Sequence, residues 1–254
     1  MAQSNIEWTE LTWNPVTGCN KISPGCKFCY AETMTKRLTA MGVEKYKDGF
    51  NLRIHPDTLN IPFTWKKSKV VFVNSMSDLF HPEVPLEFIK AVFSVMNKTP
   101  QHIYQVLTKR SDRLLELSSE LNWTSNIWMG VSVENEEYTF RIDDLSKSGA
   151  KTKFLSIEPL IGEVRTLNLE KINWVIVGGE SGHKARPVYK EWIDYVRIKC
   201  KEQKIAFFFK QWGKPKFNEN PNDPTINAEH PKHAKGGCQL DGKIYRELPK
   251  KKAA

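Results

Sequence analysis

The sequence has no long hydrophobic run. Its longest unbroken stretches of aliphatic and aromatic residues are about as long as Val70–Val73 and Ile205–Phe209, whereas a membrane helix needs roughly 20 apolar residues. The mean hydropathy is −0.50. Residues Met1–Glu10 also lack a basic region followed by an apolar stretch, which is the pattern of a secretory signal. We therefore expect a cytoplasmic protein that does not cross a membrane.

Cysteine is scarce, and its odd count of five argues against a disulfide framework in a chain without a secretory signal. Cys19, Cys26 and Cys29 nevertheless fall close together, with the spacing C-x6-C-x2-C, whereas Cys200 and Cys238 lie far away. Glycine and proline within the cluster predict a loop that can aim three thiolates at one point. Apolar residues at helical spacing predict a helix from Ala31 to Met41 directly after it.

Three interpretations of these cysteines compete. They could be separate buried residues, which the tight spacing disfavours. They could hold a structural zinc ion, but zinc takes four ligands, and no second C-x2-C or H-x3-H pair supplies the fourth. The candidates for that ligand are Cys200, Cys238, His230 and His233. They could hold a cubane iron–sulfur cluster, in which three cysteines leave one iron open to an exogenous ligand.

The rest of the chain alternates between β-rich and helical segments. The predicted strands are Val70–Asn74, Ile103–Thr108, Ile127–Val133, Lys153–Ile157, Trp174–Val177 and Ile205–Phe209, after a short strand before Cys19. The predicted helices are Pro85–Asn97, Ser111–Leu121, Glu134–Lys147 and Val188–Gln203. This alternation, with strands apolar on both faces, predicts an α/β fold. We expect a partial or complete (β/α) barrel with about six to seven parallel strands.

The composition changes after about residue 212. We assign residues 1–212 to the barrel domain and residues 213–254 to a basic extension, rich in proline and glycine, that packs on or caps the barrel. Within the extension, Asp241-Gly242 predicts the turn of a hairpin over Gly236–Tyr245. Cys200, on an apolar helical segment, is expected to be a small buried residue.

Almost every predicted strand ends in polar residues. Examples are Asn74–Asp78 after the second strand and Thr108–Arg110 after the third. The carboxyl ends of parallel strands carry the active site in barrels and open α/β sheets. We therefore expect these strand ends and the cysteine loop to share one site.

A three-cysteine loop after the first strand of a β/α barrel resembles the radical S-adenosylmethionine (SAM) superfamily. The resemblance implies a [4Fe–4S] cluster held by Cys19, Cys26 and Cys29. It also implies SAM on the open iron and an external electron donor, whose electron cleaves SAM to a 5'-deoxyadenosyl radical. The usual spacing is C-x3-C-x2-C, so the first interval here is longer. Phe28, the aromatic residue before the last cysteine, is implied to lie near the adenine.

Longer segments resemble a bacterial and phage family of radical-SAM-like proteins of unknown function, the Gp37/Gp68 phage group. They include Thr12–Cys19, Val73–His81, Gln105–Arg110, Gly130–Asn135, Leu155–Leu160, Val175–Gly182 and Phe209–Gly213. The resemblance covers nearly the whole chain and implies the cytoplasm of a bacterium or a phage-infected host. Gly178-Gly179-Glu180 follows a late strand, so it is not equated with the superfamily's usual Gly-Gly-Glu motif.

The segments Ser77–Glu83 and Leu107–Lys109 resemble those of spore photoproduct lyase and its relatives, in which these strand ends bind SAM. Carried over, Ser75, Ser77 and Asp78 become candidates for the amino group of SAM and Lys109 for its carboxylate. The chemistry of SAM also needs a carboxylate for the amine, a cation for the carboxylate and polar groups for the ribose. Ser132 and Glu134 would suit the ribose hydroxyls.

The late strand ends remain for the substrate. The candidates there are Glu158, Glu180, Arg186, Lys210, Gln211 and Trp212. Trp13 and Trp212 flank the predicted site and could stack on adenine or on a substrate base.

We therefore expect a radical SAM enzyme that acts on an unidentified substrate. The net charge of +9 and the lyase-like segments favour a nucleobase in DNA or RNA. Two alternatives stay open: a zinc-stabilised nucleic-acid-binding module without catalysis, and a cluster protein that activates a partner protein.

Overall fold

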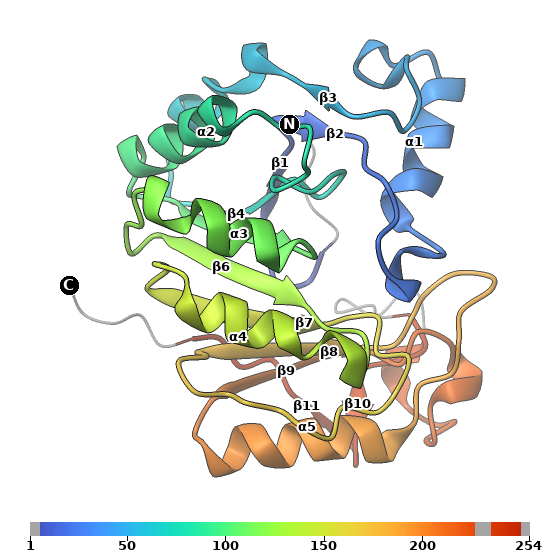
Figure 1. The fold of residues 1–254 in the computed structure, drawn as a ribbon. Helices are drawn as coiled ribbons and strands as arrows, with labels where there is room; N and C mark the ends of the chain where they lie inside the picture. The colour runs from blue at the N-terminus through green and yellow to red at the C-terminus, as the bar shows by residue number, and fades with distance from the viewer. Residues whose placement is uncertain (1–5, 227–234, 250–254) are drawn as a thin grey trace. The chain divides into compact units, whose positions relative to one another are not determined.

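The computed structural model describes residues 6–226 and 235–249 (Figure 1). The chain forms two compact units. The first comprises residues 1–131 and 147–152, and the second comprises residues 132–146 and 153–254. His230 and His233, the predicted alternative zinc ligands, lie outside the described residues.

The first unit is built on four parallel strands in the order β1-β4-β5-β6. They span Leu11–Trp13, Val70–Val73, Ile103–Thr108 and Ile127–Ser132. The strands β4 and β6 are buried along most of their length, which explains their unbroken apolar runs. A small antiparallel pair, β2 (Val16–Thr17) and β3 (Arg53–Ile54), extends the chain beyond β1.

Three helices belong to this unit: α1 (Tyr30–Ala40), α2 (Leu86–Lys98) and α3 (Ser111–Leu117). In Figure 1, α1 lies on the opposite side of β1 from α2. Helix α2 buries Phe88, Ile89, Val92, Phe93 and Met96, spaced as on one face of a helix. The ring of Phe93 packs edge-on against Trp123 with centroids 4.9 Å apart.

The second unit contains the parallel strands β7 (Thr152–Ile157), β8 (Trp174–Gly178) and β9 (Ala206–Gln211), in that order. Helices α4 (Phe140–Lys147) and α5 (Lys190–Glu202) accompany them. The hairpin of β10 (Gln239–Leu240) and β11 (Lys243–Ile244) completes the unit. Its turn residues Asp241 and Gly242 both have positive φ, so the predicted hairpin and its turn are confirmed.

The predicted α/β fold is confirmed, since the described residues contain seven parallel strands. A closed TIM barrel has eight, so the strand count corresponds to the partial barrel of the prediction. The predicted boundary at residue 212 stays a prediction. Residues 235–249 bond along β9: Phe209 N–H donates to the Tyr245 carbonyl at 3.0 Å and Glu247 N–H to the Phe207 carbonyl at 3.2 Å.

Two predicted helices are shorter than expected. The helix at Ser111 ends at Leu117, where the chain changes to a 3-10 turn, because the Ser118 carbonyl accepts from Trp123 Nε1 at 3.0 Å. The helix expected from Glu134 begins only at Phe140. Before it, the Glu134 carbonyl accepts from Ile161 N–H at 2.9 Å, which holds the chain extended.

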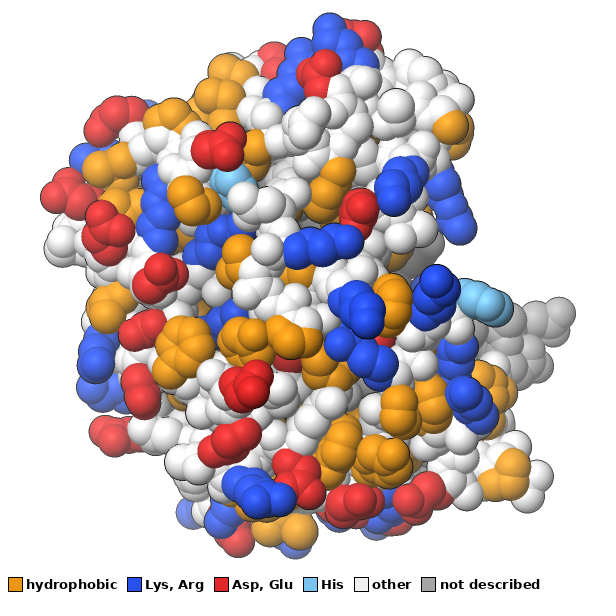
Figure 2. Space-filling model, turned by 45° about the vertical axis from the view of Figure 1, so that its right-hand side comes forward, with side chains coloured by type: hydrophobic (Ala, Val, Ile, Leu, Met, Phe, Trp, Pro, Cys, Tyr) orange, Lys and Arg blue, Asp and Glu red, His pale blue; other side chains and the backbone are white. Residues whose placement is uncertain are grey.

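None of the described helices is both long and apolar enough for a membrane span. On the face in Figure 2, acidic and basic side chains are interspersed, with hydrophobic side chains exposed between them.

Candidate functional site

The ends of β1 and β4 are joined by side-chain hydrogen bonds just before the cysteine loop. Asn14 follows β1, and its Oδ1 accepts from Ser75 Oγ and from the Met76 N–H, both at 3.2 Å. Ser77 Oγ donates to the Val16 carbonyl at 2.8 Å. The two predicted serines therefore lie beside the chain that leads to Cys19.

Gly18 fixes where the cysteine loop begins. Its φ is +78°, and its N–H donates to the Met76 carbonyl at 3.1 Å. A Cβ at this position would overlap the carbonyl of Asn51, so the close approach requires glycine. The next residue, Cys19, donates its N–H to the Phe50 carbonyl at 3.2 Å.

The loop contains three unpaired thiols, all half-buried. Cys26 ends a short 3-10 turn, Pro24–Cys26, and its Sγ lies 3.6 Å from Ser23 Oγ. Cys29 is the residue before helix α1. The predicted helix after the cysteines is thereby confirmed within one residue at either end.

Asp78, at the end of β4, organises the end of β5. Its Oδ1 accepts from Thr108 Oγ1 at 2.7 Å and from Phe80 N–H at 3.0 Å. Its Oδ2 accepts from Lys109 N–H at 3.1 Å and from Arg110 Nη1 at 3.0 Å. The carboxylate is buried and both of its oxygens are in use. In this conformation it has little capacity left for the amino group of a ligand.

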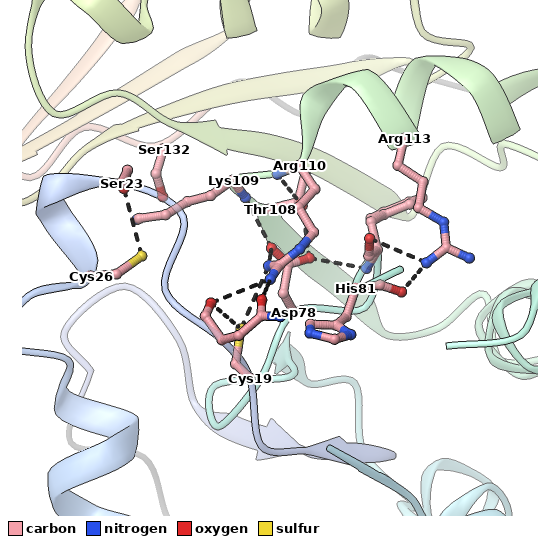
Figure 3. A network of polar contacts seen from close by, with 12 residues as sticks. Cys19, Ser23, Cys26, Asp78, His81, Thr108, Lys109, Arg110, Arg113 and Ser132 are labelled. Atoms are coloured by element: carbon pink, nitrogen blue, oxygen red, sulfur yellow. Dashed lines mark hydrogen bonds and ion pairs between the residues drawn. The ribbon is translucent and has the colours of Figure 1, made fainter. Parts of the chain in front are cut away.

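Arg110 links this network to the cysteine loop (Figure 3). Besides Asp78, its Nη1 contacts Cys19 Sγ at 3.5 Å, and its Nη2 donates to Asn20 Oδ1 at 2.5 Å. Burial raises the pKa of the Cys19 thiol to about 11, although the guanidinium opposes this increase. The Arg110 guanidinium is therefore positioned to stabilise a thiolate or another anion at Cys19.

Cys26 has a more acidic environment than Cys19. Burial favours its thiol, but a backbone hydrogen bond at Ile22, the Lys109 ammonium and Ser23 outweigh that effect and lower its pKa. The Lys109 ammonium is therefore close enough to act electrostatically on Cys26. Phe28 is half-buried, and the Lys27 ammonium lies 5.5 Å from its ring centroid.

The three thiols do not converge in this conformation. Across the described ranges, no group of three or more His, Cys, Asp and Glu side chains is arranged to hold a metal ion. The donor set of three free cysteines fits an iron–sulfur cluster with one open iron better than a structural zinc ion, which takes four ligands. The cations Arg110 and Lys109 act on these thiols. Such cations compensate the negative charge of thiolate ligands.

Cys200 and Cys238 are fully buried in the second unit. Burial raises the pKa of the Cys200 thiol to about 12. The prediction that Cys200 is a small buried residue is confirmed.

Three carboxylates of the second unit each follow a strand, and each pairs with a cation. Glu134 is 0% exposed and lies 2.8 Å from Arg141 of α4. Arg141 Nη1 also donates to the Ser132 carbonyl at 2.8 Å. The two predicted ribose ligands are thus brought together, but the Glu134 carboxylate has no exposed surface.

The predicted substrate residues form two further pairs. Glu158 accepts from Ser156 Oγ at 3.3 Å and lies 3.2 Å from the Lys210 ammonium. Glu180 accepts from Arg186 Nε at 2.8 Å and from its Nη2 at 2.5 Å.

Two other predicted substrate-side residues have structural contacts. Gln211 is buried, and its Nε2 donates to the Gly179 carbonyl at 3.1 Å. The expectation that Trp13 and Trp212 stack on a base is wrong for this conformation, since both are 2% exposed. Their indole N–H groups donate to the carbonyls of Thr58 and Gln239.

Sequence reasoning assigned no role to Arg110, Asn14, Asn20 and Arg141. Arg110 had a visible signal, because it directly follows Lys109 at a polar strand end. Asn14 likewise follows β1. Arg141 had none, because an arginine on an amphipathic helix is ordinarily exposed.

No curated protein matches the chain. Two solved structures show weak similarity. One is a mutant of spore photoproduct lyase, with 14% identity, a TM-score of 0.46 and coverage of 83% of this chain. The other is spore photoproduct lyase complexed with dinucleoside spore photoproduct, with 13% identity, a TM-score of 0.44 and coverage of 79%. The chain spans 58% and 63% of their lengths.

A family model matches residues 3–249, almost the entire chain, and its description is "Protein of unknown function (DUF5131)". The resemblance to the Gp37/Gp68 phage group stays a prediction beside it. On this match, the chain belongs to the DUF5131 family of proteins of unknown function.

Proposed function

We propose that this chain is a radical SAM enzyme whose [4Fe–4S] cluster is held by Cys19, Cys26 and Cys29. The observation that carries the proposal is the cysteine loop itself. Its three free thiols lie beside two cations, with Arg110 contacting Cys19 and Lys109 lowering the pKa of Cys26. When bound, the cluster would supply the electron that cleaves SAM to a 5'-deoxyadenosyl radical. That electron would come from an external donor.

The amino acid end of SAM would be held by Ser75, Ser77 and Lys109. Each serine hydroxyl donates to a protein oxygen, which leaves its lone pairs to accept from an ammonium group. Lys109 would bind the carboxylate. Asp78 acts as a positioning residue in this proposal, because its carboxylate already fixes Thr108, Lys109 and Arg110.

The adenosine end is assigned by residue chemistry. Phe28 offers a half-buried ring for the adenine, and Ser132 and Glu134 offer polar groups for the ribose. Glu134 would first have to exchange part of its ion pair with Arg141 for a ribose hydroxyl. Opening this ion pair would cost more free energy than any other change that the proposed SAM site requires, because the pair is fully buried.

The substrate would be a nucleobase in DNA or RNA. The ion pairs Glu158–Lys210 and Glu180–Arg186 combine hydrogen-bond acceptors with donors, as recognition of a base edge requires. The side chains of Gln211 and Trp212 donate to the backbone carbonyls of Gly179 and Gln239. In this proposal they hold the region in shape and do not contact the substrate.

Anaerobic reconstitution with iron and sulfide tests the proposal. The expected product is a brown protein with the visible absorption of an iron–sulfur cluster, which converts SAM to 5'-deoxyadenosine when dithionite is added. A colourless protein that binds one zinc ion and no SAM would refute the proposal and support the nucleic-acid-binding module instead.

Two cysteine variants test the ligand assignment. Cys26→Ala should lose the cluster, measured as iron and sulfide bound per chain. Cys200→Ala, the control, should retain it, because that thiol is fully buried in the second unit. Equal loss from both variants would contradict the assignment.

A further inference from the structure

Three segments of the second unit lie against one another after strands β8 and β9. The Lys214 ammonium donates to the His183 carbonyl, which ties the segment after β9 to the segment after β8. Gly213 N–H donates to the Lys235 carbonyl at 2.7 Å. A Cβ on Gly213 would overlap the Glu180 carbonyl, so the backbones are in direct contact.

These segments carry a group of lysines that we call the lysine cluster: Lys184, Lys214, Lys216 and Lys235. Lys184 follows His183, and both are exposed. Lys216 lies in the 3-10 turn directly after Lys214 and is exposed, as is Lys235. The contacts between the three segments therefore bring the backbones of these four lysines into one region of the second unit.

The lysine cluster differs from the basic residues that form ion pairs elsewhere among the described residues. Lys47, Lys90 and Lys199, for example, each pair with a nearby glutamate. Among the described residues, no carboxylate lies within ion-pair distance of the four ammonium groups of the lysine cluster. Cations gathered without acidic partners produce a positive local potential that attracts an anion with several charges.

We infer that the lysine cluster binds the phosphate backbone of a single-stranded nucleic acid. A nucleic-acid strand carries phosphates at regular intervals, which suits several separate lysines better than a single small anion does. An aromatic ring is also present: Phe217 is half-buried, with the Lys216 ammonium 5.1 Å from its centroid. Rings beside cations are the usual means of stacking unpaired bases.

This inference deepens the proposed function, because it names the substrate's polymer class, yet its contacts lie entirely within the second unit. The backbone would be held by the lysines, while the base would go to the strand-end pairs already assigned. Nucleic-acid binding by the lysine cluster can therefore be measured whether or not the protein carries its iron–sulfur cluster.

Fluorescence anisotropy with a labelled single-stranded oligonucleotide of mixed sequence tests the inference. The triple variant Lys184→Gln/Lys214→Gln/Lys216→Gln should bind at least about tenfold more weakly than the wild type at low salt. The slope of log affinity against log salt should also become shallower by about 2, since each lost single-strand contact removes about 0.7.

Two further variants provide controls. Lys66→Gln/Lys67→Gln/Lys98→Gln removes the same charge from exposed lysines of the first unit and should bind like the wild type. The double variant Lys184→Gln/Lys216→Gln leaves the contact of Lys214 with His183 intact. Its loss of binding should lie between those of the wild type and the triple variant, and it still tests the inference if the triple variant folds poorly.

Three outcomes would overturn the inference: no binding by the wild type, equal loss in both triple variants, or equally tight lysine-dependent binding of anionic vesicles or poly-glutamate. Cleavage of SAM, measured in the same preparations, separates this inference from the proposed function. Lysine-dependent oligonucleotide binding without SAM cleavage would refute only the enzyme. SAM cleavage without oligonucleotide binding would refute only the inference.

Discussion

At the scale of single residues, Asp78 is the side chain on which the end of β5 depends. Its carboxylate and the Arg110 guanidinium are both buried and lie 3.0 Å apart. Removing one partner of such a pair leaves a buried charge without compensation. The pair therefore matters more for the shape of the strand end than an exposed ion pair would.

We expect Asp78→Asn to lower the free energy of unfolding by about 3–5 kcal/mol, measured by urea denaturation. The matched control is Glu32→Gln, which breaks more exposed pairs with Lys21 and Lys36 and should cost less than about 1 kcal/mol. Similar costs for both variants would show that the Asp78 network does not stabilise the unit.

His55 predicts how stability depends on pH. Its imidazole is 6% exposed, lies 2.8 Å from Thr17 Oγ1, and has its pKa lowered from 6.5 to about 4 by burial, with Lys45 and Arg53 adding to the effect. The folded state therefore keeps His55 neutral, whereas the unfolded chain binds a proton below pH 6.5. The contribution of His55 to the free energy of unfolding is fully present above pH 6.5. The free energy of unfolding should fall by about 3 kcal/mol as the pH drops to 4.

Urea denaturation at several pH values between 7 and 4 measures this loss. His55→Gln should flatten the dependence by about the same 3 kcal/mol, because its side chain does not titrate. Two other buried histidines, His81 and His102, also have lowered pKa values and remain in both proteins. An unchanged slope in the variant would assign the effect to those residues instead.

The residue scale also shows where sequence reasoning reaches its limit. The spacing of Cys19, Cys26 and Cys29 could be read directly, and so could the polar ends of the strands. The saturation of Asp78 could not, because it depends on where Thr108 and Arg110 lie in space. The burial of Trp212 likewise follows from the packing of the C-terminal segment, which leaves no periodic signal.

At the scale of elements, the cysteine loop is placed by the turn at Gly18 rather than by its own residues. The turn combines a positive φ with direct contact to the Asn51 backbone. Strand boundaries were predictable within a few residues because apolar runs end where polar residues begin. The short β2–β3 pair was not predicted, since two-residue strands have no periodicity to detect.

Gly18→Ala should lower the free energy of unfolding by more than about 2 kcal/mol, since it adds steric overlap to backbone strain. Gly42→Ala is the control: Gly42 also has positive φ, but its Cβ would meet open space, so strain alone of about 1 kcal/mol applies. Thermal and urea denaturation of both variants measure the difference. Equal losses would show that the Asn51 contact can relax.

At the scale of the whole molecule, residues 235–249 lie in the second unit together with strands β7, β8 and β9. Arg246 donates to the carbonyls of Phe209 and Lys210. The segment around Tyr245 occupies backbone groups of β9 that would otherwise be free at the strand's edge. An exposed apolar edge strand promotes aggregation.

A chain ending at Trp212 should therefore be insoluble or should lose its cooperative thermal transition. Solubility after expression and differential scanning calorimetry are the measurements. A soluble shortened chain with a cooperative transition would instead establish residues 1–212 as an independent domain, as the sequence predicts.

The contact between Arg110 and Cys19 joins residues 91 positions apart, and this separation has a consequence for synthesis. At about 5–20 residues per second, a ribosome needs about 5–18 s to pass from one to the other. During that interval the cysteine loop is present but the Arg110 guanidinium is not, so Asp78 cannot yet hold the guanidinium beside Cys19. The thiols are thus made first, and the groups that balance their charge arrive later, so any cluster loaded during translation would meet the loop before its electrostatic surroundings are complete.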